Sequence, residues 1–205
     1  MKRTTTRRRK EATAFVTENR RLFPFVALFL LGVLIGVLMY VAADRPAEEW
    51  AALLRVSVAP QGFQGGLAAL WSSVLSVVVL LGGLFLFGLW PCGAPFILFV
   101  PLFYGLGLGL TEAYYYSLGG QGVAAVALVV MPHGLLCAAV LVMAAVESLR
   151  LSTRLSRQLL PSAACGGLWS VFRLYCLRFL LFLATAVFVG LLDVLFQMAF
   201  GRFLP

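Results

Sequence analysis

Charged residues are scarce in this chain, and over one long stretch they are absent. Charged side chains make up 12% of the sequence, against ~25% in an average soluble domain. Residues 56–111 contain no Asp, Glu, Lys or Arg. Water could not solvate such a stretch, whereas about 20 apolar residues cross the hydrocarbon core of a bilayer as one helix. We therefore predict an all-α, polytopic membrane protein.

The side chains that usually carry chemistry are also few. The sequence has one histidine and four cysteines, with no CxxC pair and no Gly-Lys-Ser/Thr phosphate loop. Cys137 falls in a predicted span and the other cysteines fall on the predicted cytoplasmic side, where thiols stay reduced. No serine lies in a nucleophile turn. We expect no enzyme activity, no catalytic residue, no cofactor and no metal site.

The apolar residues, 62% of the chain, gather into runs of spanning length. We predict a basic tail, residues 1–21, and a single multi-span domain, residues 22–205, with about five transmembrane helices. The predicted spans are residues 22–43, 67–89, 96–111, 123–146 and 179–200. Two short amphipathic helices, residues 47–54 and 148–160, are expected to lie at the membrane interface.

Basic residues mark one side of the membrane. Of the sixteen Lys and Arg, eight lie in residues 1–21 and five lie in residues 150–178. Short cytoplasmic loops carry an excess of Lys and Arg. This pattern predicts a cytoplasmic N-terminus and, with five spans, an extracytoplasmic C-terminus in the cell membrane. The net charge of +8 is therefore read as a topology signal, and nucleic acid is not an expected partner.

Small residues recur at helical spacing in two spans. Gly32 and Gly36 lie in the first span, and Gly105 and Gly109 lie in the third. Such pairs let helix backbones approach closely within lipid. We interpret them as packing within one chain, and a homo-oligomer contact is the alternative.

Polar residues within the predicted spans are the other candidates. Pro132, His133 and Gly134 lie in the fourth span, and Asp193 lies in the fifth. Proline removes a backbone donor and kinks a helix, and an intramembrane histidine needs a partner. We expect His133 to bond a carbonyl freed by the kink; a proton relay with Asp193 is the alternative.

Four elements follow one another in a recognisable order. They are the turn Gly88-Leu89-Trp90-Pro91-Cys92-Gly93-Ala94-Pro95, the segment Tyr104-Gly105-Leu106-Gly107-Leu108-Gly109, the element Met131-Pro132-His133-Gly134, and Asp193. Over roughly residues 21–200 this order resembles the stage II sporulation protein M family of endospore-forming bacteria. The chain departs from that pattern by having Cys137 where relatives often have Glu, and Asp193 where Glu is usual.

The resemblance implies a non-catalytic scaffold. Family members anchor a cell-wall-remodelling complex in the mother-cell membrane, and their partners, stage II sporulation proteins D and P, cut peptidoglycan during engulfment. In this chain Trp50, in the largest predicted external segment, is the candidate contact because exposed Trp is a common binding hot spot. The alternative is a permease-like subunit powered by a separate ATPase, suggested by the kinked fourth span and the Arg-bearing helix after it.

Overall fold

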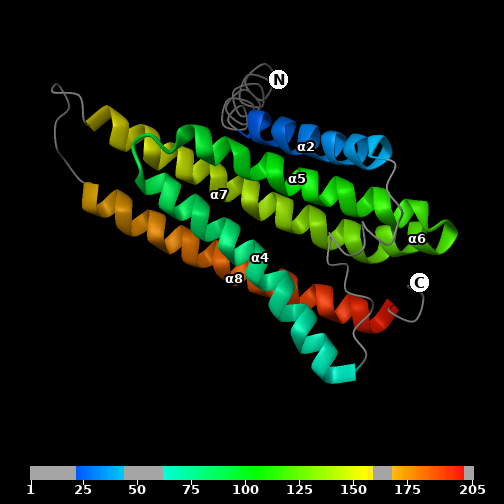
Figure 1. Ribbon diagram of the computed structural model, residues 1–205. Helices are drawn as coiled ribbons and strands as arrows, with labels where there is room; N and C mark the ends of the chain where they lie inside the picture. Colours follow the sequence, from blue (N-terminus) through cyan, green and yellow to red (C-terminus); the bar gives the residue numbers. More distant parts are fainter. Residues whose placement is uncertain (1–21, 44–61, 159–167, 201–205) are drawn as a thin grey trace, which may run out of the picture.

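The computed structural model describes residues 22–43, 62–158 and 168–200, and these are helical apart from short turns. The helices, labelled in Figure 1, are α2 (Phe23–Ala42), α4 (Gly62–Leu89), α5 (Ala94–Ser117), α6 (Gly120–Ala125), the π-helical segment η1 (Val126–Val130), α7 (Met131–Gln158) and α8 (Leu168–Phe200). Trp50, the basic tail and the predicted interfacial helix of residues 47–54 lie outside the described residues.

Four described helices are long and apolar enough to cross a membrane, namely α2, α5, α7 and α8. The described apolar part of α4 that could count toward a span, Val74–Leu89, is shorter. The five predicted spans correspond to α2, α4, α5, α7 and α8, so the all-α, membrane-spanning fold class is confirmed.

Helix α7 occupies the centre of the bundle. It packs against α5 on one side and against α4 and α8 on the other, while α2 packs chiefly on α5 (Figure 1). The Trp90–Gly93 turn makes α4 and α5 antiparallel neighbours, and the α6–η1 segment returns the chain into α7. The centre of α7 is accordingly buried, with Leu141 and Ala145 fully enclosed.

Helices α4, α5, α7 and α8 extend beyond the predicted spans. The predicted spans 96–111 and 179–200 stop next to charged residues, but α5 continues through Glu112, which is buried, and α8 begins before Arg173 and Arg178. The prediction of a separate interfacial helix at residues 148–160 is wrong for its described part, because α7 runs unbroken to Gln158. Ser148, Leu151 and Ser152 pack inside the bundle and do not face the membrane surface.

The four predicted glycines form one contact between α2 and α5, here called the glycine seam: Gly32, Gly36, Gly105 and Gly109. A methyl group on either α2 glycine would collide with an α5 carbonyl, that of Leu102 or Leu106. A methyl group on either α5 glycine would collide with the carbonyl of Phe29 or Val33 on α2. The contact is therefore reciprocal and backbone-to-backbone, as small-xxx-small pairs allow in lipid.

The order of these contacts also fixes the helix directions. Phe29 meets Gly105 and Val33 meets Gly109, so α2 and α5 run parallel. The Tyr40 hydroxyl donates to Ser117 Oγ at 2.8 Å near the C-terminal ends of both helices. The chain turns back after α5 and runs through α6 and η1 into α7, so α2 and α5 run one way and α7 the other (Figure 1).

Substitution in α5 tests the glycine seam against a matched site. Gly109→Ala places a methyl group against the Val33 carbonyl, while Gly107→Ala places it in open space on the same helix. Overpacking costs roughly 1–3 kcal/mol, and Ala is the better helix former. We expect Gly109→Ala to lower the melting temperature in detergent and Gly107→Ala to leave it unchanged or raise it. Equal effects would contradict the glycine seam.

The orientation of the bundle stays a prediction from the basic residues. We call the end that carries the Trp90–Gly93 turn, Arg150 and Arg178 the basic end. The other end carries Leu118, between α5 and α6.

Thiol labelling checks which end faces the cytoplasm. In a variant whose only thiol is Cys92, which is exposed at the basic end, an impermeant maleimide should react only after the cells are permeabilised. A variant whose only thiol comes from Leu118→Cys should react in intact cells. Labelling of Cys92 from outside would reverse the predicted orientation.

Candidate functional site

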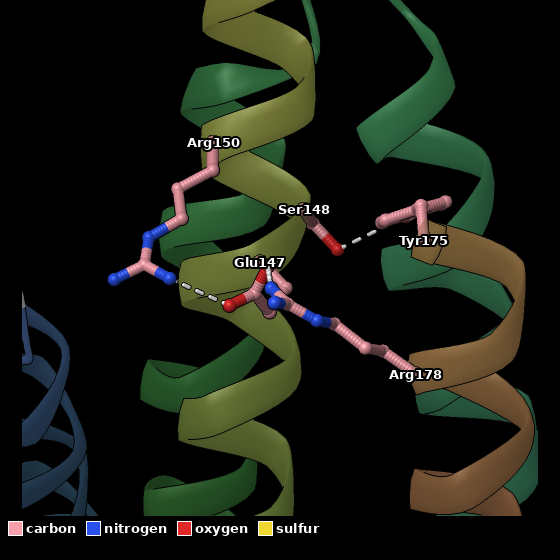
Figure 2. A network of polar contacts seen from close by, with 5 residues as sticks. All are labelled: Glu147, Ser148, Arg150, Tyr175 and Arg178. Carbon is pink, nitrogen blue, oxygen red and sulfur yellow. Dashed lines mark hydrogen bonds and ion pairs between the residues drawn. The ribbon is translucent and has the colours of Figure 1, made fainter. Parts of the chain in front are cut away.

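A charged network joins α7 to α8 at the basic end. Glu147 Oε1 accepts a hydrogen bond from Arg150 Nη1 at 2.7 Å, and Oε2 accepts one from Arg178 Nη1 at 2.6 Å. Figure 2 shows the Glu147 carboxylate between the Arg of its own helix and the Arg of α8. One carboxylate therefore neutralises part of the positive charge of both helices and holds their ends together.

Uncharged side chains extend this network toward α4. Ser148 Oγ lies 3.3 Å from the Tyr175 hydroxyl, as drawn in Figure 2, and that hydroxyl lies 3.1 Å from the Phe85 carbonyl. Gly88 leaves room for the tyrosine, since a methyl group there would strike the hydroxyl. Helices α4, α7 and α8 thus meet where the buried hydroxyls of Ser148 and Tyr175 lie together.

Ser152 holds the turn between α4 and α5. Its Oγ donates to the Trp90 carbonyl at 2.8 Å. Ser152 is fully buried, and the carbonyl belongs to the turn residues that follow the last full turn of α4. The same carbonyl also accepts the Gly93 N–H at 3.0 Å within the turn, so the serine adds a second donor and ties α7 to the turn.

Sequence reasoning missed the whole network of Glu147, Ser148, Ser152, Tyr175 and Arg178. Only the helical spacing of Ser148 and Ser152, four residues apart, hinted at a polar face. Their partners are far away in the sequence, and no local pattern identifies them. The charges of Arg150 and Arg178 were read as a topology signal and not as members of an ion pair.

The second polar cluster contains His133 and lies deeper in the bundle. His133 Nε2 lies 3.6 Å from Cys137 Sγ one turn along α7, and Nδ1 lies 3.9 Å from Asp193 Oδ1 on α8. The Tyr104 hydroxyl of α5 donates to the Gly134 carbonyl at 3.3 Å. The structure therefore brings Asp193 to His133, as the proton-relay alternative requires, and adds Tyr104 and Cys137.

His133 lies beside an irregular part of the helix, where η1 passes into α7. Pro132 has no N–H for the carbonyl four residues earlier, and the π-helical segment η1 ends two residues before this proline. Such wide turns are rare and often occur at functional sites. The expected bond from His133 to a freed carbonyl is not among the described contacts; at Gly134 the donor to the carbonyl is Tyr104.

The contacts of His133 resemble those of a catalytic base: it lies between Cys137, a possible nucleophile, and Asp193, an acid that could orient the ring. That order alone would suggest covalent catalysis. Cys137 is only 1% exposed, however, and packs in the hydrophobic core. A substrate has no route to the sulfur in this conformation, so the geometry does not support a nucleophile.

The other candidates are placed as follows. The glycines at 105 and 109 belong to the glycine seam and not to either polar cluster. Gly134 lies beneath the Leu108 side chain of α5, which a methyl group would strike. Within residues 22–43, 62–158 and 168–200, no group of three or more His, Cys, Asp or Glu side chains could hold a metal ion.

Comparison with known protein families gives a match. The sequence model described as stage II sporulation protein M matches residues 25–192, from the first turn of α2 to the residue before Asp193. No curated protein and no solved structure matches the chain. The matched range covers most of the chain and nearly all of the described bundle. The chain therefore belongs to the stage II sporulation protein M family, and is a sporulation-related membrane protein.

Proposed function

We propose that this protein is a non-catalytic membrane scaffold of the engulfment machinery. It would anchor peptidoglycan-remodelling partners, the stage II sporulation proteins D and P, in the mother-cell membrane. The observation that carries the proposal is the family match, which runs through the bundle from α2 to α8. The proposed orientation, with the basic end in the cytoplasm, leaves the opposite end to face the partners.

The contacts of the bundle support a scaffold because they fix distances between helices. The glycine seam joins α2 to α5 through backbone atoms. Glu147 joins α7 to α8, and Tyr175 joins α8 to α4. Most exposed residues of α8 are large and apolar, among them Leu180, Phe188 and Leu195, as lipid contact requires. A bundle held in this way can present an external surface in a constant position.

The proposed contact surface is the segment between α2 and α4 that contains Trp50. We infer this from the sequence, since the segment is the largest predicted external part and lies outside the described residues. A cell-wall hydrolase acts outside the membrane, so its contact must lie at the external end. Trp at such a surface contributes about 2 kcal/mol or more when it is a hot spot, roughly thirtyfold in affinity.

Affinity capture in sporulating cells tests the scaffold and its surface together. Trp50→Ala should reduce recovery of the two partner proteins while the variant stays inserted and abundant. Trp169→Ala is the matched control, because Trp169 is 77% exposed at the start of α8 and therefore at the basic end. Normal capture by both variants would exclude Trp50 as the contact, and absence of both partners from wild-type captures would overturn the scaffold.

A permease-like subunit is the second candidate, favoured by the His133 cluster. A π-helical segment beside a half-buried histidine and a buried carboxylate is unusual for a purely structural span. A separate ATPase would have to supply the energy and would dock at the basic end, where Arg154 is exposed. Recovery of an ATPase in the same captures, with ATP-dependent movement of a solute or lipid in vesicles, would favour this candidate.

A further inference from the structure

One buried nitrogen stands out among the described side chains. His133 Nδ1 is buried without a hydrogen-bond partner, and within the described ranges no other buried side-chain nitrogen or oxygen is in that state. The nearest acidic oxygen is Asp193 Oδ1, 3.9 Å away on the neighbouring helix. Buried polar groups are nearly always hydrogen-bonded. The missing partner of Nδ1 therefore points to a hydrogen bond in which Nδ1–H donates to the Asp193 carboxylate.

The two ring nitrogens decide where that proton lies. A neutral imidazole has one N–H and one lone pair. If Nδ1 carried only its lone pair, it would face a carboxylate oxygen, and two acceptors would repel. If Nδ1 carries the proton, it points a donor at Asp193 and leaves Nε2 to accept from the Cys137 thiol, 3.6 Å away. Protonation at Nδ1 makes both contacts attractive.

The burial of Asp193 also favours a donor beside its carboxylate. Asp193 is 5% exposed, and an ionised carboxylate inside a bilayer is costly unless it is paired. A neutral His133 becomes an imidazolium by taking a proton from a hydronium ion: one O–H bond of hydronium breaks, one N–H bond of the ring forms, and a water molecule is left. The imidazolium and an ionised Asp193 together have no net charge, and Nε2 then donates to Cys137 Sγ.

The surrounding groups leave this role to His133. Tyr104 and Tyr115 of α5 and Cys137 of α7 lie within the electrostatic reach of Asp193. Glu112 is a further buried acid on α5, and residues 126–130 of η1 have no ionisable side chain. None of these groups is basic.

We propose that His133 and Asp193 form a proton-binding site between α7 and α8, in which Nδ1 of the imidazole holds a proton against the Asp193 carboxylate. Its ligand is a proton from water, and binding joins the two helices at a second level, away from the Glu147–Arg178 contact. The site does not depend on the scaffold function. It would make the α7–α8 contact sensitive to protonation within the bilayer.

The single histidine makes the test direct. We would purify the full chain with a streptavidin-binding tag, so that His133 stays its only histidine. The chain would be labelled with ¹⁵N-histidine, placed in nanodiscs, and its two ring-nitrogen shifts read near neutral pH. We expect the wild-type protein to show a protonated Nδ1. Asp193→Leu should lose that signal and shift the ring to the Nε2–H form.

Two further variants keep the test decisive. Asp193→Asn retains an acceptor without a charge, so it should keep Nδ1 protonated yet show less imidazolium on acidification; it decides the matter if Asp193→Leu fails to fold. Glu112→Leu removes another buried acid of the bundle and should leave the ring unchanged. An unprotonated Nδ1 in the wild-type protein would overturn the proposal. So would unchanged shifts in a folded Asp193→Leu variant, as much imidazolium in Asp193→Asn as in the wild-type protein on acidification, or an equal change in Glu112→Leu.

Discussion

A polar group inside a bilayer must find its partner within the protein, because lipid offers none. In this bundle most of the described polar contacts between helices involve α7. Glu147 reaches Arg178 of α8, Ser148 reaches Tyr175, and Ser152 reaches the turn after α4. The helices α4, α5 and α8 all pack directly against this central helix, and α2 packs chiefly on α5.

The helix at the edge is held by a different force. Between α2 and α5 the contact is made mainly by glycine surfaces and carbonyl oxygens, where dispersion depends on close approach, and the Tyr40–Ser117 hydrogen bond adds to it at one end. Such a contact tolerates no added methyl group at Gly32 or Gly109. Polar pairing at the centre and close backbone packing at the edge are therefore complementary ways to fix helices where the hydrophobic effect gives no preference.

Much of the fold follows from the sequence, because hydropathy and spacing are local signals. The apolar runs predicted the helices, and the helical spacing of Gly105 and Gly109 predicted a close contact. Charged residues misled the prediction of helix ends, since Glu112 and Arg178 lie inside helices whose neighbours accommodate them. The pairs Glu147–Arg178 and His133–Asp193 depend on how α7 lies against α8. Sequence alone could name His133 and Asp193 as partners but not show them together, and it gave no sign of Glu147.

The central claim is that paired polar groups on α7 hold the bundle together. A double-mutant cycle on Glu147 and Arg178 tests it most directly, with thermal unfolding of Glu147→Gln, Arg178→Gln and the double variant measured in nanodiscs. If the ion pair joins α7 to α8, the double variant should lose less stability than the sum of the single variants, by about 0.5 to 3 kcal/mol. Strictly additive losses would show that the two side chains act independently and would contradict the account.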